Sequence, residues 1–412
     1  MSLTIIKKTE ISKLDTFNKW KQNPGKGEVF TPNGLVNEIL DQIPTEIWED
    51  PKSTFCDLSM GKGTFLIEIV NRLVYIYNYT EEDAKSRVFG YDIRVKYINY
   101  LKRRGYKNVF HKDSLTEKFN MEFDVVLGNP PYQEVTGASN AKAIWPKFVQ
   151  KSFDICKEDG YVSLIHPSGW RDVKGNFSHI KDLLKSKNIK YLNVNDFNKG
   201  KEVFGVGTNF DWYVVENCNN KCGLTKINTT NNVDVEYCLD NMEVIPNHSY
   251  DLINPLIYTG IGEKINLLNS ESTYAHRKQH MSKEQTEDYV YPCVYTITQK
   301  DGINFWYSKV NNGHIGQPKV IWSNGLGTYP ILDLEGHYGL MEYSFAIIDE
   351  PQNLPLIKKV MESDIFTKLM DSVRFINHRF QWKTISTFRK DFWKDFLDEN
   401  NNVIEPNYKN AE

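Results

Sequence analysis

Four consecutive residues stand directly after the apolar run at residues 123–128: Asn129, Pro130, Pro131 and Tyr132. The two prolines fix the backbone and remove two amide donors, so carbonyl oxygens stay available as acceptors. An aromatic amine is a poor nucleophile because its lone pair is delocalised into the ring. If the Asn129 side-chain oxygen and the Pro130 carbonyl each accept one amine hydrogen, the nitrogen can rehybridise towards an electrophilic carbon. Tyr132 could stack on the ring that carries the amine, whereas the alternative is an ordinary turn that ends a strand.

A second group of residues joins an earlier apolar run to an amphipathic segment. It holds Asp57, Gly61 and Gly63 within residues 57–65. Glycines let the backbone approach a ligand closely, and the start of the following helix favours a negative group. The segment is not a P-loop, because Lys62 is followed by glycine rather than Ser or Thr and the upstream glycine is missing. It indicates a ligand-binding turn, although a plain tight turn uses the same glycines.

Two further acidic residues follow later apolar runs. Asp92 ends the run at 87–92, where a carboxylate can accept hydrogen bonds from both hydroxyls of a ribose. Asp113 follows the run at 108–111, where a carboxylate could accept from an adenine amine. Either residue could instead cap a helix. Three such turns in chain order nevertheless indicate one nucleoside-binding edge.

Alternating apolar runs and amphipathic stretches predict the elements that position these residues. We expect strands at 53–57, 87–92, 108–111, 123–128 and 160–165, with helices between them and one near 141–157. This alternation predicts a doubly wound α/β domain whose ligands lie at the carboxyl ends of the strands. Upstream, Thr31 at the cap position and Pro32 at the first helical position predict a helix start.

The rhythm changes in the second half of the chain. Residues 211–216 and 224–228 resemble a hairpin around Asn219. Beyond residue 240 the chain is rich in Asn, Tyr and isolated aromatics, with few regular helices before Leu354. We therefore predict two domains, at residues 1–230 and 231–412, the second of mixed α+β structure.

Composition restricts the kind of protein. The chain has 412 residues, 40% of them hydrophobic, and no apolar run approaches the roughly 20 residues that span a bilayer. Its start lacks the regions of a signal peptide, and six scattered cysteines form no disulfide framework, so we expect a cytoplasmic protein. Cys218, Cys222, Cys238 and His248 lack paired ligand spacing, and we expect no metal site.

The charge distribution leaves nucleic-acid binding open. A net charge of −3 argues mildly against it, but local positive charge matters more than the sum. Residues 374–394 interleave six basic residues with six aromatic ones and a single acid, Asp391. This stretch and residues 316–325 are the candidates for DNA contact; a solvated helix face is the alternative for residues 374–394.

Taken together, residues 25–220 resemble the gamma-class amino DNA methyltransferases, the N6-adenine-modifying enzymes of restriction-modification systems. The resemblance implies a mostly parallel, seven-stranded, Rossmann-like sheet followed by a target-recognition domain, and S-adenosyl-L-methionine as cofactor. It implies that Thr31, Asp57 and Gly61 contact the methionine part, Asp92 the ribose and Asp113 the adenine. The family's first loop usually reads Pro-Ala-Cys-Gly-Thr-Gly, from which residues 58–62 depart here while both glycines remain.

The same resemblance implies a reaction and its partners. Asn129, Pro130 and Tyr132 match the catalytic tetrapeptide, and Phe204 matches an aromatic that packs against the flipped base. The implied activity is methylation of an adenine flipped out of double-stranded DNA, by a monomer on DNA, with any restriction endonuclease on a separate polypeptide. The alternatives are an RNA or protein-glutamine methyltransferase on the same fold, and a non-catalytic DNA-binding relative.

Overall fold

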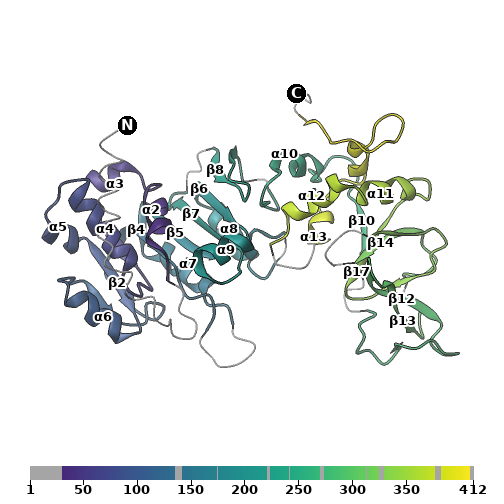
Figure 1. Ribbon diagram of the computed structural model, residues 1–412, viewed down its shortest axis with the longest axis horizontal. Coiled ribbons are helices and arrows are strands. Elements are labelled where there is room, and N and C mark those ends of the chain that lie inside the picture. The colour runs from purple at the N-terminus through teal and green to yellow at the C-terminus, as the bar shows by residue number, and fades with distance from the viewer. Residues whose placement is uncertain are drawn as a thin grey trace. The chain divides into compact units, whose positions relative to one another are not determined.

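The computed structural model describes residues 30–134, 142–173, 175–219, 223–240, 242–269, 273–311, 313–323, 329–375 and 382–408. The chain forms two compact units (Figure 1), and each is described by itself: Met1–Trp170 with Asn176–Asn241, and Arg171–Gly175 with Met242–Glu412. Arg171 belongs to the second unit because its guanidinium donates to the Ile245 carbonyl oxygen and to Asn247 Oδ1, both at 2.8 Å. No helix within the described ranges has the length and apolar character to cross a membrane.

One nine-stranded sheet runs through the first unit. Its order is β3-β2-β1-β4-β5-β7-β6-β8-β9. The strands are β1 (Phe55–Asp57), β2 (Val88–Asp92), β3 (Val109–His111), β4 (Phe123–Gly128), β5 (Cys156–Pro167), β6 (Asn188–Asn195), β7 (Phe210–Glu216), β8 (Thr225–Asn228) and β9 (Asp234–Tyr237). Strands β1 to β5 are parallel, and β7 is antiparallel to both of its neighbours. The sheet has nine strands rather than the expected seven, because β8 and β9 extend one edge, and the first unit includes residues up to Asn241.

The predicted hairpin of residues 211–216 and 224–228 is wrong. Strand β6 lies between them, antiparallel to β7 and parallel to β8. Strand β8 instead forms a hairpin with β9, in which Ile227 faces Val235 and Asn232 takes a φ of 56° in the turn. The apolar pattern of residues 211–216 and 224–228 fits a direct pairing of the two strands as well as a pairing of each with β6. The pattern therefore could not show that β6 lies between them.

Helices and one 3-10 helix connect these strands. They are α2 (Asn33–Leu40), α3 (Thr45–Glu49), α4 (Thr64–Tyr75), α5 (Glu81–Ser86), α6 (Val95–Lys102), α7 (Trp145–Asp154), η2 (Ser168–Arg171), α8 (Ser178–Lys185) and α9 (Phe197–Phe204). Helix α4 follows β1 and buries Leu66, Ile69 and Leu73 completely in the core. Strand β4 lies mid-sheet as its apolar sequence predicts, with Val125 and Leu127 fully buried.

The second unit has mixed α+β structure around its own core. Two four-stranded sheets have the orders β10-β17-β14-β15 and β11-β13-β12-β16. The strands are β10 (Asn266–Asn269), β11 (Met281–Ser282), β12 (Tyr291–Thr298), β13 (Gly302–Ser308), β14 (Lys319–Ser323), β15 (Ile331–Asp333), β16 (Gly339–Leu340) and β17 (Ser344–Ile348). The helices are α10 (Tyr250–Ile253), η3 (Asn254–Leu256), α11 (Leu354–Met361), α12 (Asp364–Ser372), α13 (Trp382–Ile385) and η4 (Phe392–Phe396). Trp322, Phe345 and Phe366 pack together in this core.

Candidate active site

The strand order brings the predicted site residues to one edge of the sheet. Strands β2, β1 and β4 are adjacent and parallel, so their carboxyl ends meet. Asp57 ends β1, Asp92 ends β2, and Asn129 follows β4. Ligands of open parallel sheets bind at this edge, outside the carboxyl ends of the strands.

The contact between Asp57 and Gly128 defines the floor of this edge. Gly128 has a φ of 153°, and a Cβ atom built on it would lie 2.7 Å from Asp57 Oδ1. Only glycine therefore lets the carboxylate lie against the backbone that immediately precedes Asn129. Asp57 is buried, and its Oδ1 accepts the Ser59 N–H at 2.9 Å.

Burial makes the ionised form of Asp57 costly. The pKa of its carboxyl is raised to about 7, mainly by desolvation and also by the negative charge of Asp92, against the lowering effect of the Ser59 N–H. A buried carboxylate with this environment is stabilised by a cationic partner. The floor of the edge is therefore suited to a positively charged ligand group.

The glycine loop is tied to the end of β2. The Gly61 N–H donates to Asp92 Oδ2 at 2.9 Å, and the Arg94 N–H donates to Asp92 Oδ1 at 2.7 Å. Gly61 has a φ of 52°, and a Cβ there would meet no atom within 4 Å, so this backbone borders open space. Gly63 has a φ of 80°, and its Cβ would lie 2.6 Å from Leu101 Cδ1, so its lack of a side chain serves helix packing.

Lys62, one of the loop residues that depart from the family pattern, contacts an aromatic ring in the structure. Lys62 Nζ lies 3.7 Å from the centroid of the Phe30 ring. Phe30 in turn lies edge-on to Tyr97, with 6.4 Å between ring centroids. The replaced position thus connects the glycine loop to the segment that carries Thr31.

Asn129 is held by that same segment. Its Nδ2 donates to Thr31 Oγ1 at 3.2 Å, across 98 residues of sequence. Thr31 and Pro130 are buried, Asn129 is half-buried and Pro131 is exposed. Among the described residues, none donates a hydrogen bond to Asn129 Oδ1 or to the Pro130 carbonyl. Within the described part of the chain, both acceptors that the expected chemistry needs are therefore available.

Thr31 does not play the capping role that its sequence predicts. Helix α2 begins at Asn33, and Pro32 occupies the N-cap position without a side-chain cap. The Val36 N–H bonds the Pro32 carbonyl oxygen at 3.1 Å. Proline takes the cap position because its extended backbone, at φ −64° and ψ 146°, suits that position.

Tyr132 has a half-buried ring and a buried hydroxyl. Its carbonyl oxygen accepts the Ile144 N–H at 3.0 Å, which ties the tyrosine to the segment before α7. The hydroxyl has no hydrogen-bond partner in the described part of the chain, and burial, with the charge of Asp211 adding, raises its pKa. Asp211 itself is buried and accepts from Ser168 Oγ at 3.0 Å and Trp170 Nε1 at 2.8 Å. The sequence alone did not single out Asp211.

Two other predicted site residues, Asp113 and Phe204, make contacts within their own surroundings. Asp113 is exposed, and its Oδ1 accepts the Leu115 N–H at 3.0 Å in a short turn. The adjacent Ser114 is buried and donates to the Leu58 carbonyl oxygen at 2.7 Å, which fixes this turn against the glycine loop. Phe204 ends α9 and lies edge-on to Phe210, with 4.8 Å between ring centroids. Its half-buried ring is thus partly engaged in the core.

Sequence reasoning also missed an apolar surface beside Asp92. Ile93 is 64% exposed and Val95 is 52% exposed, directly after the end of β2. The sequence did contain a signal for this surface, namely the apolar residue Ile93 directly after the acidic residue that ends β2. Large apolar side chains are usually buried, so one at this position could have been noticed. The side chains of Ile93 and Val95 form an exposed apolar surface next to the end of β2.

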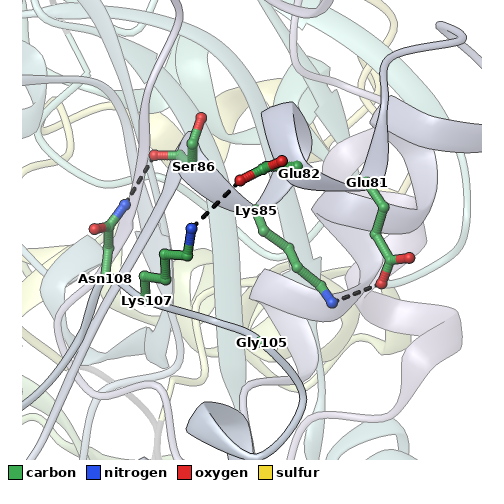
Figure 2. Close-up of a pocket in the computed structure, with 7 residues that line it drawn as sticks. All are labelled: Glu81, Glu82, Lys85, Ser86, Gly105, Lys107 and Asn108. Carbon is green, nitrogen blue, oxygen red and sulfur yellow. Dashed lines mark hydrogen bonds and ion pairs between the residues drawn. The ribbon is translucent and has the colours of Figure 1, made fainter.

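A cavity of about 480 Å³ lies away from this edge (Figure 2). It is lined by Glu81, Glu82, Lys85, Ser86, Gly105, Lys107 and Asn108. Ser86 and Asn108 stand just before the amino ends of β2 and β3, opposite to the edge that holds Asp57 and Asn129. Lys85 pairs with Glu81 at 2.6 Å and Lys107 with Glu82 at 3.4 Å, so the cavity's charges are satisfied locally. It is not the candidate active site.

Lys319, which lies in the predicted DNA-contact segment 316–325, is not exposed in the structure. Lys319 is fully buried and pairs with Asp333 at 2.9 Å, so it cannot reach a phosphate or a base. Asn324 and Gly325 lie outside the described residues.

The basic stretch at 374–394 is also largely engaged. Arg374 pairs with Asp371, Arg389 with Asp391 and Asp395, and Lys390 with Glu263. Its aromatic residues Phe375, Phe388, Phe392 and Trp393 belong to the core. Residues 376–381 lie outside the described part. Where the stretch is described, Arg374, Arg389 and Lys390 have acidic partners, so these three charges are engaged within the protein.

The cysteines give one grouping of possible ligands in the described ranges. Asp159, Glu216 and Cys218 have ligand atoms within 4.8 Å of one another. Cys238 is exposed, and Cys222 lies outside the described residues. Acidic groups often cluster without an ion, so the expectation of no metal site remains a prediction.

Comparisons with known proteins show which proteins the chain resembles. Residues 57–204 match the family model of the Eco57I restriction-modification methylase. An uncharacterized adenine-specific methylase of Mycoplasma pneumoniae is 28% identical over 239 residues, which cover 50% of this chain and 55% of that protein. The type II methyltransferase M.VspI of a Vibrio species is 28% identical over 195 residues, covering 42% of this chain and 44% of that protein. The chain thus spans about half the length of these relatives.

A solved structure extends the likeness of the fold to both units. It is a nuclease-deletion mutant of the type ISP restriction-modification enzyme LlaGI in complex with a DNA substrate mimic. The TM-score is 0.54 at 11% identity, covering 92% of this chain and 55% of that chain. At this identity the likeness concerns the fold alone. The matches to the family model and to the two relatives confirm the resemblance to adenine-specific restriction-modification methylases that the sequence predicts.

Proposed function

We propose that the chain is a site-specific DNA adenine N6-methyltransferase, on the premise that residues 57–204 match the family model of the Eco57I restriction-modification methylase. The observation that supports this proposal most is the pair of hydrogen-bond acceptors at Asn129 and Pro130, directly after β4. Asn129 Oδ1 and the Pro130 carbonyl oxygen lie side by side in sequence and have no donor among the described residues. Two acceptors in this arrangement match the two hydrogens of an exocyclic amine.

The residues at the edge fit S-adenosyl-L-methionine. This cofactor supplies a methyl group on a positively charged sulfur, which makes the methyl carbon electrophilic. Asp57 would face the cationic methionine end, because its burial raises its pKa and a cation relieves that cost. Asp92 would accept from the ribose hydroxyls, Asp113 would approach the adenine amine, and Ile93 would cover the adenine ring. The open space beside Gly61 leaves room for the backbone to contact the ligand.

The chain's own residues then act on the target base. Asn129 and Pro130 would accept the two amine hydrogens and draw the nitrogen lone pair out of the ring, which orients it towards the methyl carbon. Tyr132 would stack on the base, a contact of about 1–3 kcal/mol. Phe204 would pack against the base from another side. The proton that the amine loses must leave to solvent or to an acceptor of the site after transfer.

Flipping an adenine out of a duplex costs roughly a few kcal/mol, which DNA contacts must offset. We assign that role to the second unit, as a target-recognition domain at residues 231–412 in the sequence-based division. The likeness of fold, over 92% of the chain, to a restriction-modification enzyme in complex with a DNA substrate mimic supports this assignment. The chain would act as a monomer on double-stranded DNA, with a separate polypeptide carrying any restriction activity.

Methyl transfer to several substrate classes tests the proposal. The full chain is incubated with cofactor carrying a labelled methyl group and with duplex DNA, RNA or a glutamine-containing release factor. Label on DNA, recovered as N6-methyladenine after digestion, is the expected result. Label on RNA or on protein instead would assign the same corner to one of the alternative substrates. Cofactor binding without transfer to any substrate would favour a non-catalytic relative.

A further inference from the structure

Thr31 has a hydroxyl whose position the reaction described above does not yet use. The family pattern assigns this residue to the cofactor's methionine end. In the structure, Thr31 is buried, and its Oγ1 accepts a hydrogen bond from Asn129 Nδ2 at 3.2 Å. Pro32 occupies the N-cap of α2 instead, so the hydroxyl is not needed to cap the helix.

We propose that Thr31 is a positioning residue that fixes the side-chain amide of Asn129 in the orientation needed for catalysis. This inference rests on the proposed function. An amide carries its oxygen and nitrogen on opposite sides of one carbon, so anchoring Nδ2 on Thr31 directs Oδ1 the other way. A rotation of the amide by half a turn would present two donors to the amine hydrogens, and donors repel each other.

The segment before α2 can keep Thr31 in place because hydrogen bonds and an ion pair attach α2 to α4. The buried carboxylate of Glu68 accepts from Asn33 Nδ2 at 2.8 Å and from Asn37 Nδ2 at 3.1 Å. At the far end of α2, Arg72 pairs with Asp41 at 2.8 Å. Two clamps along one short helix fix its start, and Thr31 stands two residues before that start.

The hydroxyl retains its proton while it accepts the Asn129 bond. In the described part of the chain no group accepts that proton. A donation to the cofactor is therefore compatible with the anchor, but the two roles predict different losses when the hydroxyl is removed. Loss of a cofactor contact weakens cofactor binding, whereas loss of the anchor slows the chemical step and leaves cofactor binding nearly unchanged.

Thr31→Val removes the hydroxyl at nearly constant shape, and Thr31→Ser restores it. Thr225→Val is the matched control, because Thr225 is also buried and its Oγ1 donates to the Ile189 carbonyl oxygen at 2.8 Å, on β8 outside the candidate site. We expect Thr31→Val to lower the single-turnover methylation rate about tenfold or more, since misorientation of a catalytic group costs rate rather than binding. The cofactor dissociation constant should change less than about threefold. Thr31→Ser and Thr225→Val should keep the rate.

The double variant Thr31→Val, Asn129→Ala tests whether Thr31 affects the methylation rate through Asn129. If Thr31 acts through Asn129, removing the hydroxyl has no further effect once the amide is gone. Multiplied losses would overturn the proposal. So would a weakened cofactor affinity at unchanged rate, or a failure of Thr31→Ser to rescue.

A readout without catalysis separates this inference from the proposed function. In full-length protein labelled with nitrogen-15 on asparagine, the Asn129 side-chain amide resonance is assigned by its loss in Asn129→Ala. Thr31→Val should shift this resonance, whereas Thr31→Ser and Thr225→Val should leave it in place. An unshifted resonance in Thr31→Val would contradict the anchor. If the wild-type protein methylates no adenine, the proposed function fails, while the resonance still decides whether the hydroxyl holds the amide.

Discussion

At the scale of single residues, Asp57 combines a stability cost with the binding role that we propose for it. Its folded-state pKa of about 7 lies above the ordinary value of 3.8, so the folded protein binds a proton that the unfolded chain releases between these values. The contribution to the free energy of unfolding is complete at low pH and is lost as pH rises towards about 7. A site that binds a cation gains from such a carboxylate, although the fold does not.

Asp57→Asn should therefore stabilise the protein at about pH 8 and have little effect near pH 4, where Asp57 is protonated in wild type. Thermal unfolding across this range measures the difference. The same substitution should weaken binding of S-adenosylmethionine, and wild-type affinity should rise through about pH 7 while that of the variant stays flat. A stability difference between the variant and the wild type that is the same at both pH values would show that the carboxylate is not desolvated.

Tyr132 is expected to need its ring and not its hydroxyl. The hydroxyl is buried without a partner among the described residues, and an unsatisfied buried polar group costs about 1–3 kcal/mol. Tyr132→Phe should keep methylation and keep or raise the melting temperature. Tyr132→Ala should lose most methylation because no ring remains to stack on the base. A large loss of activity in Tyr132→Phe would mean that the hydroxyl finds a functional partner when substrate is bound.

At the scale of elements, the close approach of β1 and β4 builds the site. Gly128→Ala places a Cβ atom 2.7 Å from Asp57 Oδ1, at a φ of 153° that other residues rarely adopt. It should lower both the melting temperature and the cofactor affinity. Gly34→Ala is the matched control, because Gly34 lies in α2 with no atom within 4 Å of its Cβ position. Alanine there should stabilise the helix by about 0.5–1 kcal/mol. Equal effects of the two substitutions would argue against a specific contact at Gly128.

The elements also show what the sequence could and could not predict. Local apolar runs predicted β1 to β4 nearly to their ends, because each buried strand carries its own pattern, whereas β5 extends beyond the predicted residues 160–165 to Cys156–Pro167. The partner of β8 depended on β6, which no local pattern reveals, and the expected hairpin was wrong for that reason. The meeting of Asp57, Asp92 and Asn129 could be expected from the strand rhythm, but the Thr31–Asn129 bond joins residues 98 apart and needed the structure.

At the scale of the whole molecule, each unit has its own core and its own charged interior. Lys319 in the second unit is fully buried, where it donates to the His314 and Gln317 carbonyl oxygens at 2.9 Å and pairs with Asp333. Sequence reasoning made this segment a candidate for DNA contact because lysine, asparagine and glutamine side chains can read base edges. The buried partner Asp333 follows 14 residues later in the numbering, as the neighbouring strand, and only the pairing of β14 with β15 brings the two together.

Lys319→Met should destabilise the protein by about 3–5 kcal/mol, because it leaves the Asp333 carboxylate buried without its cation. Lys309→Met is the control, since Lys309 forms an exposed pair with Asp288 at 3.1 Å and should cost less than about 1 kcal/mol. Denaturant unfolding measures both. Neither variant should change cofactor affinity, because all predicted cofactor residues lie in the first unit. A weakened affinity in Lys319→Met would show that the two units are coupled.

The central claim concerns the corner at Asn129 and the amine that it accepts. The most direct measurement is the amount and position of N6-methyladenine in DNA from cells that express the wild-type chain, compared with cells that express Asn129→Ala at the same level. We predict N6-methyladenine at one short recognition sequence with the wild type and none above background with the variant. The same methylation in both strains, or none in either although the purified wild-type chain binds the cofactor, would contradict the claim.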